Sequence, residues 1–165
     1  ARRELRLLDE RYDVIVHDCF TGGAEPTYLL STEMLAMIRA HLVSGGVLAL
    51  NFVGFASGPD AAAVRAVAAT LAAVLPLQRV FVTAPDEEFT DFVFFAGTTP
   101  IEFTAADATA RAVVDGVLRY ERAPLGHDGL ELRDDYNPLD TLQPRKAGRY
   151  RDLFRTRVAP ALLLP

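Results

Sequence analysis

The sequence predicts an α/β fold whose sheet is mostly parallel with an antiparallel edge. Two apolar, β-branched runs, at residues 12–18 and 47–53, each lead into a glycine turn. Each run is followed by a segment with apolar residues at helical spacing. Two more apolar runs, at 78–84 and 91–97, are close enough in sequence to pair as a hairpin. Strand, helix, strand, helix and hairpin is the element order of such a sheet.

The first half of the chain supplies a strand and two helices. Residues 1–8 mix leucines with charges and predict a short helix. The continuous apolar run at 12–18 is typical of a strand buried on both faces. Ser31 can cap the next helix. We expect that helix to stop at residues 44–46, where glycine supplies a left-handed turn.

Later elements complete the sheet. Residues 47–53 predict a second buried strand, adjacent and parallel to residues 13–17. A helix with Pro59 near its first turn should follow, then an antiparallel pair over 78–83 and 91–96. Residues 101–123 predict a further helix. We therefore divide the chain into a sheet-forming part, 1–97, and a helical and loop-rich extension of the same domain, 98–165.

Composition narrows the class of protein. A chain of 165 residues is long enough to bury a substantial core. Its net charge of −5 does not favour contact with nucleic acid or with an anionic membrane surface. One cysteine and three scattered histidines make neither a disulfide framework nor a zinc site, so no metal is expected. The most apolar window is interrupted by Arg65 and ends at Pro76, so we expect no membrane contact by this segment and a cytoplasmic location.

Polar residues at two strand ends are the first candidates for chemistry. Open parallel sheets bind ligands at the carboxyl ends of their strands, and here Asp18 and Asn51 occupy those ends. A carboxylate at such a position can hold an amine or take a proton from it. Equally, Asp18 can cap the turn that follows, with Gly22-Gly23 merely reversing the chain. Residue types alone leave both readings open.

Two motifs resemble a known family. The stretch "YDVIVHDCFTGGAEPTYLLSTEML", with the later "GGVLALN", resembles the second half of the spermidine synthase family, the polyamine aminopropyltransferases, which share the class I methyltransferase fold. The late stretch "DDYNPLDTLQPRKAGRYRDLFR" is similar to the ending of a divergent, spermidine synthase-like branch. The likeness covers residues 1–157. It implies a Rossmann-like methyltransferase sandwich, represented by the second half of its sheet and the terminal antiparallel hairpin.

The resemblance assigns an amine site. Asp18 matches the first Asp of the family's Asp-Ser-Ser-Asp motif, which contacts the attacking amine and acts as its base. Thr21 falls where the second Asp of the motif belongs, and a hydroxyl cannot supply that second negative charge. Glu25 is a candidate to restore it. Asn51 stands where the family often has a polar Gln at the next strand end.

The resemblance also assigns part of a cofactor site. Cys19 and Phe20 replace the two serines beside the cofactor's sulfur, and Asp18 lies next to them. Ala1 would follow the family's adenine-binding Asp. The family's glycine-rich cofactor loop and ribose-binding acid would precede Ala1, so we expect a longer parent chain or a partner that supplies the N-terminal half of the domain.

Two further segments are weaker candidates for substrate binding. Thr90 and Asp91 follow an acidic stretch that is most often a solvated hairpin tip, although the family places substrate-facing residues near this point. Asp135 and Tyr136 belong to the "DDYNPL" segment. That segment reads equally well as an Asx-type turn and as a lid over the active site.

The functional expectation is a spermidine synthase-like transferase of polyamine biosynthesis. It would move an aminopropyl group from decarboxylated S-adenosylmethionine to a small-molecule amine. The alternatives are methyl transfer from S-adenosylmethionine and an inactive binding module of the same fold. A homodimer stays open.

Overall fold

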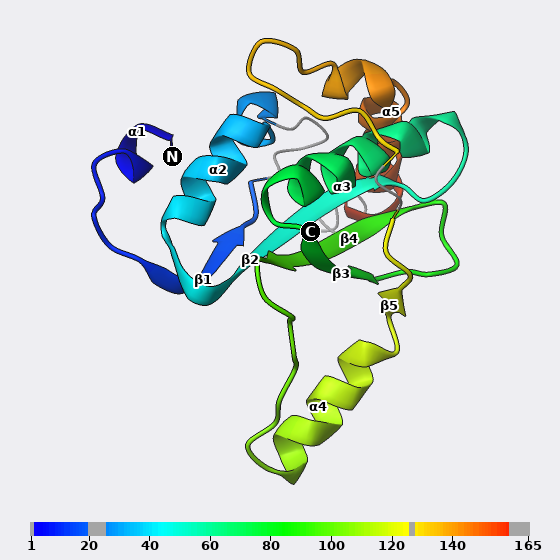
Figure 1. Cartoon of the computed structure of the whole chain (residues 1–165). Helices are drawn as coiled ribbons and strands as arrows, with labels where there is room; N and C mark the ends of the chain where they lie inside the picture. The colour runs from blue at the N-terminus through cyan, green and yellow to red at the C-terminus, as the bar shows by residue number, and fades with distance from the viewer. Residues whose placement is uncertain (1, 20–25, 126–127, 159–165) are drawn as a thin grey trace, which may run out of the picture.

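One five-stranded sheet organises the chain. The computed structural model describes residues 2–19, 26–125 and 128–158. Strand order across the sheet is β1-β2-β4-β3-β5. The strands are β1 (Tyr12–His17), β2 (Leu42–Phe55), β3 (Leu77–Val82), β4 (Phe89–Gly97) and β5 (Glu121–Arg122). The expected α/β architecture with an open sheet is confirmed (Figure 1). The prediction of a mostly parallel sheet is wrong, because one of the four described strand pairs, β1 with β2, is parallel and the other three are antiparallel.

Strand directions bring the predicted site to one edge of the sheet. β1 and β2 are parallel, with Ile15 opposite Leu48 and His17 opposite Leu50. β4 is antiparallel to both β2 and β3, so β2 and β3 run in the same direction. The carboxyl ends of β1, β2 and β3 therefore meet at one edge, together with the start of β4. The predicted parallel pair and the predicted hairpin are both confirmed.

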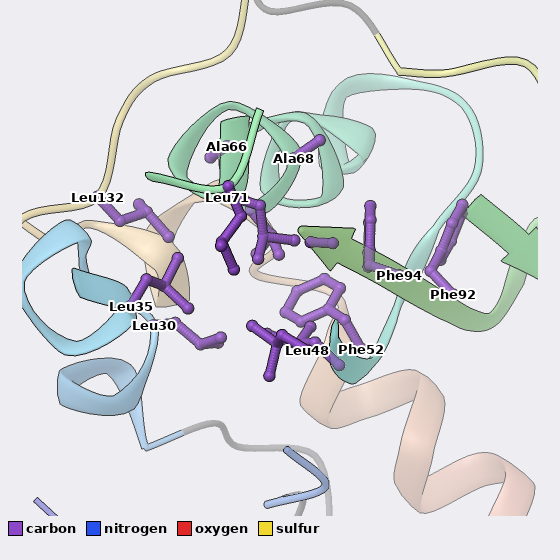
Figure 2. Packing of buried hydrophobic residues seen from close by; sticks show 14 of the residues in the cluster. Leu30, Leu35, Leu48, Phe52, Ala66, Ala68, Leu71, Phe92, Phe94 and Leu132 are labelled. Carbon is purple, nitrogen blue, oxygen red and sulfur yellow. The ribbon is translucent and has the colours of Figure 1, made fainter. Parts of the chain in front are cut away.

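Two helices cover one face of this sheet and enclose the core. α2 (Thr32–Ala40) begins at Ser31, whose side chain accepts a hydrogen bond from the Met34 amide as expected of an N-cap. α3 (Ala62–Val74) follows a short 3-10 turn that begins at Pro59. Figure 2 shows leucines of these helices packed against the inner side chains of the sheet. The fully buried members include Leu35, Leu48, Leu50, Phe52, Leu71 and Phe94.

β1 departs from the prediction of a strand buried on both faces. Val14 is 57% exposed and Val16 is 71% exposed, whereas His17 on the other face is buried. β1 lies at the edge of the described sheet, and these exposures show that its outer face is left largely uncovered by the described residues. The apolar run predicted a strand correctly, but run length does not show which faces are covered.

The turn after α2 also differs from the prediction. The helix ends at Ala40, with His41 as its C-cap, and β2 begins at Leu42. The glycines at 45 and 46 thus lie within the strand, where Gly45 has a φ of 82°. They form an irregularity in the pairing with β1, and a Cβ on Gly46 would lie 3.0 Å from the carbonyl oxygen of Tyr12. The glycines here allow β1 and β2 to approach closely, and they do not end the helix.

The predicted helix over 101–123 is shorter than expected. α4 spans Ala108–Leu118, and Asp107 caps it by accepting a hydrogen bond from the Ala110 amide at 2.8 Å. Figure 1 shows α4 extending away from the sheet. Residues before it are held extended because Phe103 packs edge-on against Phe95. The remaining helices are α1 (Arg2–Leu5) and α5 (Lys146–Leu153).

Candidate functional site

Asp18 and Asn51 lie next to one another at the carboxyl edge of the sheet. His17 pairs with Leu50, so the residues that follow them are neighbours on the outer face. The side-chain amide of Asn51 donates a hydrogen bond from Nδ2 to Asp18 Oδ1 at 3.2 Å. The two polar residues singled out in the sequence are therefore brought together, but Asn51 lies inside β2, which continues to Phe55, and not at the strand end predicted for it. Their roles in binding and catalysis stay predictions.

The orientation of the Asn51 amide leaves an acceptor without a partner. An ionised carboxylate only accepts hydrogen bonds, so the amino group of Asn51 must face Asp18. Asn51 Oδ1 then points elsewhere, and it is buried with no hydrogen-bond partner among the described residues. Leaving a buried acceptor unsatisfied costs about 1–3 kcal/mol. The pair thus contains an exposed carboxylate, Asp18, and a buried acceptor, Asn51 Oδ1, that no described residue satisfies.

A cavity of about 280 Å³ lies along the same edge. Val53 and Asp91, which pair across β2 and β4, both contribute to its wall. Val53 is two residues beyond Asn51 and therefore faces the same side of the sheet. The cavity mixes carboxylates and hydroxyls with apolar side chains. Its walls include Val53, Thr83, Glu87, Thr90, Asp91, Tyr150 and Leu153.

Thr90 and Asp91 differ in what they offer to this cavity. The Thr90 hydroxyl accepts a hydrogen bond from the Ala84 amide at 3.1 Å and is buried, so it holds the hairpin together. Asp91 is partly exposed and accepts a hydrogen bond from the Thr83 hydroxyl at 3.3 Å. Of these two residues, Asp91 is thus the one whose side chain remains accessible to a ligand.

Sequence reasoning missed the contribution of α5 to the cavity. Tyr150 and Leu153 lie in the stretch "RKAGRYRDLFRTR", whose many arginines are typical of a solvated helix face. Their spacing of three residues puts them on one side of the helix. That spacing indicates a shared apolar side of the helix, but the surrounding arginines indicate exposure to solvent instead.

Lys146 at the start of α5 was also missed. It is 3% exposed, and its Nζ donates a 2.5 Å hydrogen bond to the carbonyl of Val53. The ammonium also lies 4.7 Å from the centre of the Phe52 ring. Burial lowers the pKa of Lys146 to about 7. The neighbouring Arg145 forms ion pairs with Asp60 and Glu88, so this end of α5 is fixed to the end of β2.

The "DDYNPL" segment is fastened to the start of α2. Asp134 accepts two hydrogen bonds from the guanidinium of Arg2, at 2.9 and 2.6 Å, and a third from the Ser31 hydroxyl at 2.5 Å. The Arg2 hydrogen bond, followed by that of Ser31, lowers the pKa of Asp134. Asp135 is exposed and Tyr136 is 60% exposed. Substrate binding by these two residues stays a prediction.

Several predicted site residues lie outside the described residues, namely Ala1, Phe20, Thr21 and Glu25. Cys19 is described and is half-buried, with its side chain packed against the hydrophobic core.

Two kinds of feature are absent from the described residues. Ranges 2–19, 26–125 and 128–158 contain no group of three or more His, Cys, Asp or Glu side chains arranged to hold a metal ion. Within the same ranges, no helix has the length and apolar character needed to cross a membrane.

Comparison with known proteins places the fold. No family model matches the chain. A curated protein, the N-terminal histidine N-methyltransferase of Emericella nidulans, is 38% identical over 91 residues, which are 52% of this chain and 16% of that protein. The crystal structure of a probable spermidine synthase from Corynebacterium glutamicum superposes with a TM-score of 0.54 at 19% identity, over 74% of this chain and 44% of the other.

A second solved structure, MNMC2 from Aquifex aeolicus, gives a TM-score of 0.44 at 17% identity. The chain spans 16% of the length of the Emericella nidulans protein and 44% of the spermidine synthase chain, which is less than half of either. Sheet order, strand directions and the spermidine synthase neighbour agree with the fold that the motifs predict. The chain therefore has a spermidine synthase-like form of the class I methyltransferase fold.

Proposed function

We propose that this chain supplies the acceptor side of an N-alkyltransferase site, in which Asp18 and Asn51 hold a nitrogen nucleophile. The observation that carries the proposal is the pair of acceptors at the sheet edge. Asp18 contributes a carboxylate, and Asn51 contributes a buried carbonyl oxygen that lacks a partner among the described residues. A nitrogen with two N–H groups can satisfy both acceptors at once.

The carboxylate has a chemical role in such a transfer. A protonated amine has no lone pair, so it must lose a proton before or during attack. In this proposal Asp18 would accept that proton, and Asn51 Oδ1 would hold a second N–H and fix the direction of the lone pair. When bound, an S-adenosylmethionine-type sulfonium supplies the alkyl group as an electrophile. Among the described residues, Asp18 and Cys19 would lie beside it, and the carboxylate suits its positive charge.

Methyl transfer is the form of the reaction that we favour. The relative with 38% identity is by name an N-methyltransferase that acts on an N-terminal histidine. Thr21, at the position of the family's second acid, also weakens recognition of a diamine. Aminopropyl transfer is the second candidate, because the spermidine synthase neighbour shares the fold.

The adjoining cavity favours a basic acceptor. Asp91 and Glu87 contribute carboxylates to its wall, and Tyr150 and Leu153 contribute apolar surface. A second cationic group of the acceptor would be attracted there while its reacting nitrogen contacts Asp18. A peptide that begins with histidine and a simple diamine are therefore the two acceptors to compare.

The test uses the full-length protein that contains this chain. It is incubated with S-adenosylmethionine or its decarboxylated form, and with either acceptor, and products are identified by mass spectrometry. Asp18→Asn keeps the shape and a hydrogen-bonding group but removes the proton acceptor. We expect the rate to fall by roughly a hundredfold to ten-thousandfold.

Donor affinity should change far less, which calorimetry can measure in the micromolar range. Asp13→Asn, an exposed substitution at the opposite end of β1, is the matched control and should leave the rate unchanged. A wild-type rate in Asp18→Asn would refute the role of Asp18 as a base. If the wild type binds no donor, the chain is an inactive binding module instead.

A further inference from the structure

We infer that His17 is a positioning residue for the proposed site, which it serves by fixing residues 27–30 against the end of β1. This inference rests on the proposed function, because Asp18 directly follows His17. His17 is 5% exposed and lies on the face of β1 opposite to Val16 and Asp18. It therefore does not contact the reacting groups itself.

The side chain of His17 bonds to a carbonyl far along the chain. Its Nε2 lies 3.2 Å from the carbonyl oxygen of Leu29, twelve residues later. A carbonyl only accepts, so Nε2 must carry the proton and donate. Nδ1 is then the unprotonated nitrogen of a neutral ring, and it is buried with no partner among the described residues. Burial also lowers the pKa of His17, which keeps the ring neutral.

A second side chain holds the same turn from the other side. Asn137 donates from Nδ2 to the carbonyls of Thr27, at 2.8 Å, and of Leu30, at 3.3 Å. These carbonyls belong to the 3-10 turn before α2, and the Thr27 carbonyl also accepts a hydrogen bond from the Leu30 amide at 2.9 Å. His17 and Asn137 together therefore bind three carbonyls of one short turn.

This arrangement defines where the chain returns after Asp18. β1 ends at His17, and the described chain resumes at Pro26, directly before the turn that His17 and Asn137 hold. The hydrogen bond from His17 thus sets the distance between Asp18 and residues 27–30. Since catalysis depends on placement to within about 1 Å, loss of this bond should reduce turnover by roughly tenfold to a hundredfold.

The chain contains a matched control. His41 also bonds to a main-chain carbonyl, with Nδ1 3.1 Å from the Glu10 oxygen, but it lies near the start of β1. In the full-length protein, His17→Met removes the donor while keeping an apolar side chain, and His41→Met removes the corresponding bond at the far end. His17→Gln keeps an N–H donor at similar reach. We expect kcat to fall in His17→Met and to be largely restored in His17→Gln, with His41→Met near the wild type.

Two readouts do not depend on turnover. Nitrogen NMR of the imidazole should show the Nε2-protonated tautomer of His17, without titration near the usual histidine pKa. Amide hydrogen exchange at Leu29 and Leu30 should accelerate in His17→Met but not in His41→Met.

A proton on Nδ1, or unchanged exchange and unchanged kcat in His17→Met, would overturn the inference. If Asp18→Asn is fully active while His17→Met shows faster exchange, the proposed function fails and the structural part of the inference stands. If Asp18→Asn is inactive while His17→Met has wild-type turnover, the positioning role fails alone.

Discussion

Lys146 allows a quantitative test of how α5 is held. It is the only lysine in the sequence, so its titration can be followed without interference from another lysine. Burial lowers its pKa from 10.5 to about 7. In the unfolded chain the amine keeps its proton up to pH 10.5, whereas in the folded chain it loses the proton above pH 7. The unfolded state therefore binds more protons between these values, and stability contributed by this group must rise with pH.

The magnitude follows from the same values. Between pH 7 and pH 9, the native amine goes from half charged to almost fully neutral, while the unfolded amine stays charged. At 1.36 kcal/mol per pKa unit, the free energy of unfolding should rise by about 2 kcal/mol over this interval. The Val53 carbonyl and the Phe52 ring favour the charged form, so this figure is an upper bound.

The assay compares the wild type with Lys146→Met, which retains the length and apolar stem of the side chain. Urea unfolding followed by circular dichroism gives the free energy of unfolding at pH 7, 8 and 9, and isotope-labelled lysine gives the titration directly. The wild type should gain stability relative to the variant as the pH rises. If the two proteins change in parallel, and the lysine signal titrates near its ordinary pKa, the reasoning from burial is wrong.

Three other substitutions test the core, the projecting helix α4 and the substrate. Gly54→Ala should destabilise the fold by roughly 1–3 kcal/mol in urea unfolding, because a Cβ there would lie 2.6 Å from Val64 Cγ2 and 2.9 Å from the Phe52 ring. Gly116→Ala, in an exposed part of α4 with no atom within 4 Å of the new Cβ, should instead stabilise it by about 1 kcal/mol, and the opposite order would contradict the packing described here. Thr21→Asp should raise the rate with putrescine if the missing second acid limits diamine recognition, and an unchanged ratio of diamine to peptide rates would count against that explanation.

Much of the sheet could be predicted because its strands are local apolar runs. Asp18 ends the first run and Asn51 lies within the second, and parallel pairing was enough to expect the two side by side. The unpartnered oxygen of Asn51 could not be predicted, since it depends on how the whole edge packs. The exposure of Val14 and Val16 could not be predicted either. Their apolar side chains indicate a strand, but they do not show whether another element covers them.

The C-terminal stretch was harder to interpret because its meaning lies in three-dimensional contacts. The arginines around Lys146 suggested a solvated helix, yet this one lysine is buried against Phe52. That only one of the 17 basic residues is a lysine could have indicated a distinct role for this position. Lysine reaches a buried carbonyl through a slender stem and can lose its proton, whereas arginine stays charged.

The irregular pairing near Gly45 and Gly46 has a consequence at the opposite edge of the sheet. Tyr12 pairs with Leu42 but Val14 pairs with Val47, so β2 contains three more residues than β1 over this interval. An odd number of extra residues exchanges the two faces of a strand. Removing one residue there would turn Asn51 toward the core and direct a large apolar neighbour toward Asp18. Whether the number of extra residues in this glycine-containing stretch is odd or even thus determines which side chain faces Asp18. An odd number directs the amide of Asn51 toward it, and an even number would direct an apolar side chain there.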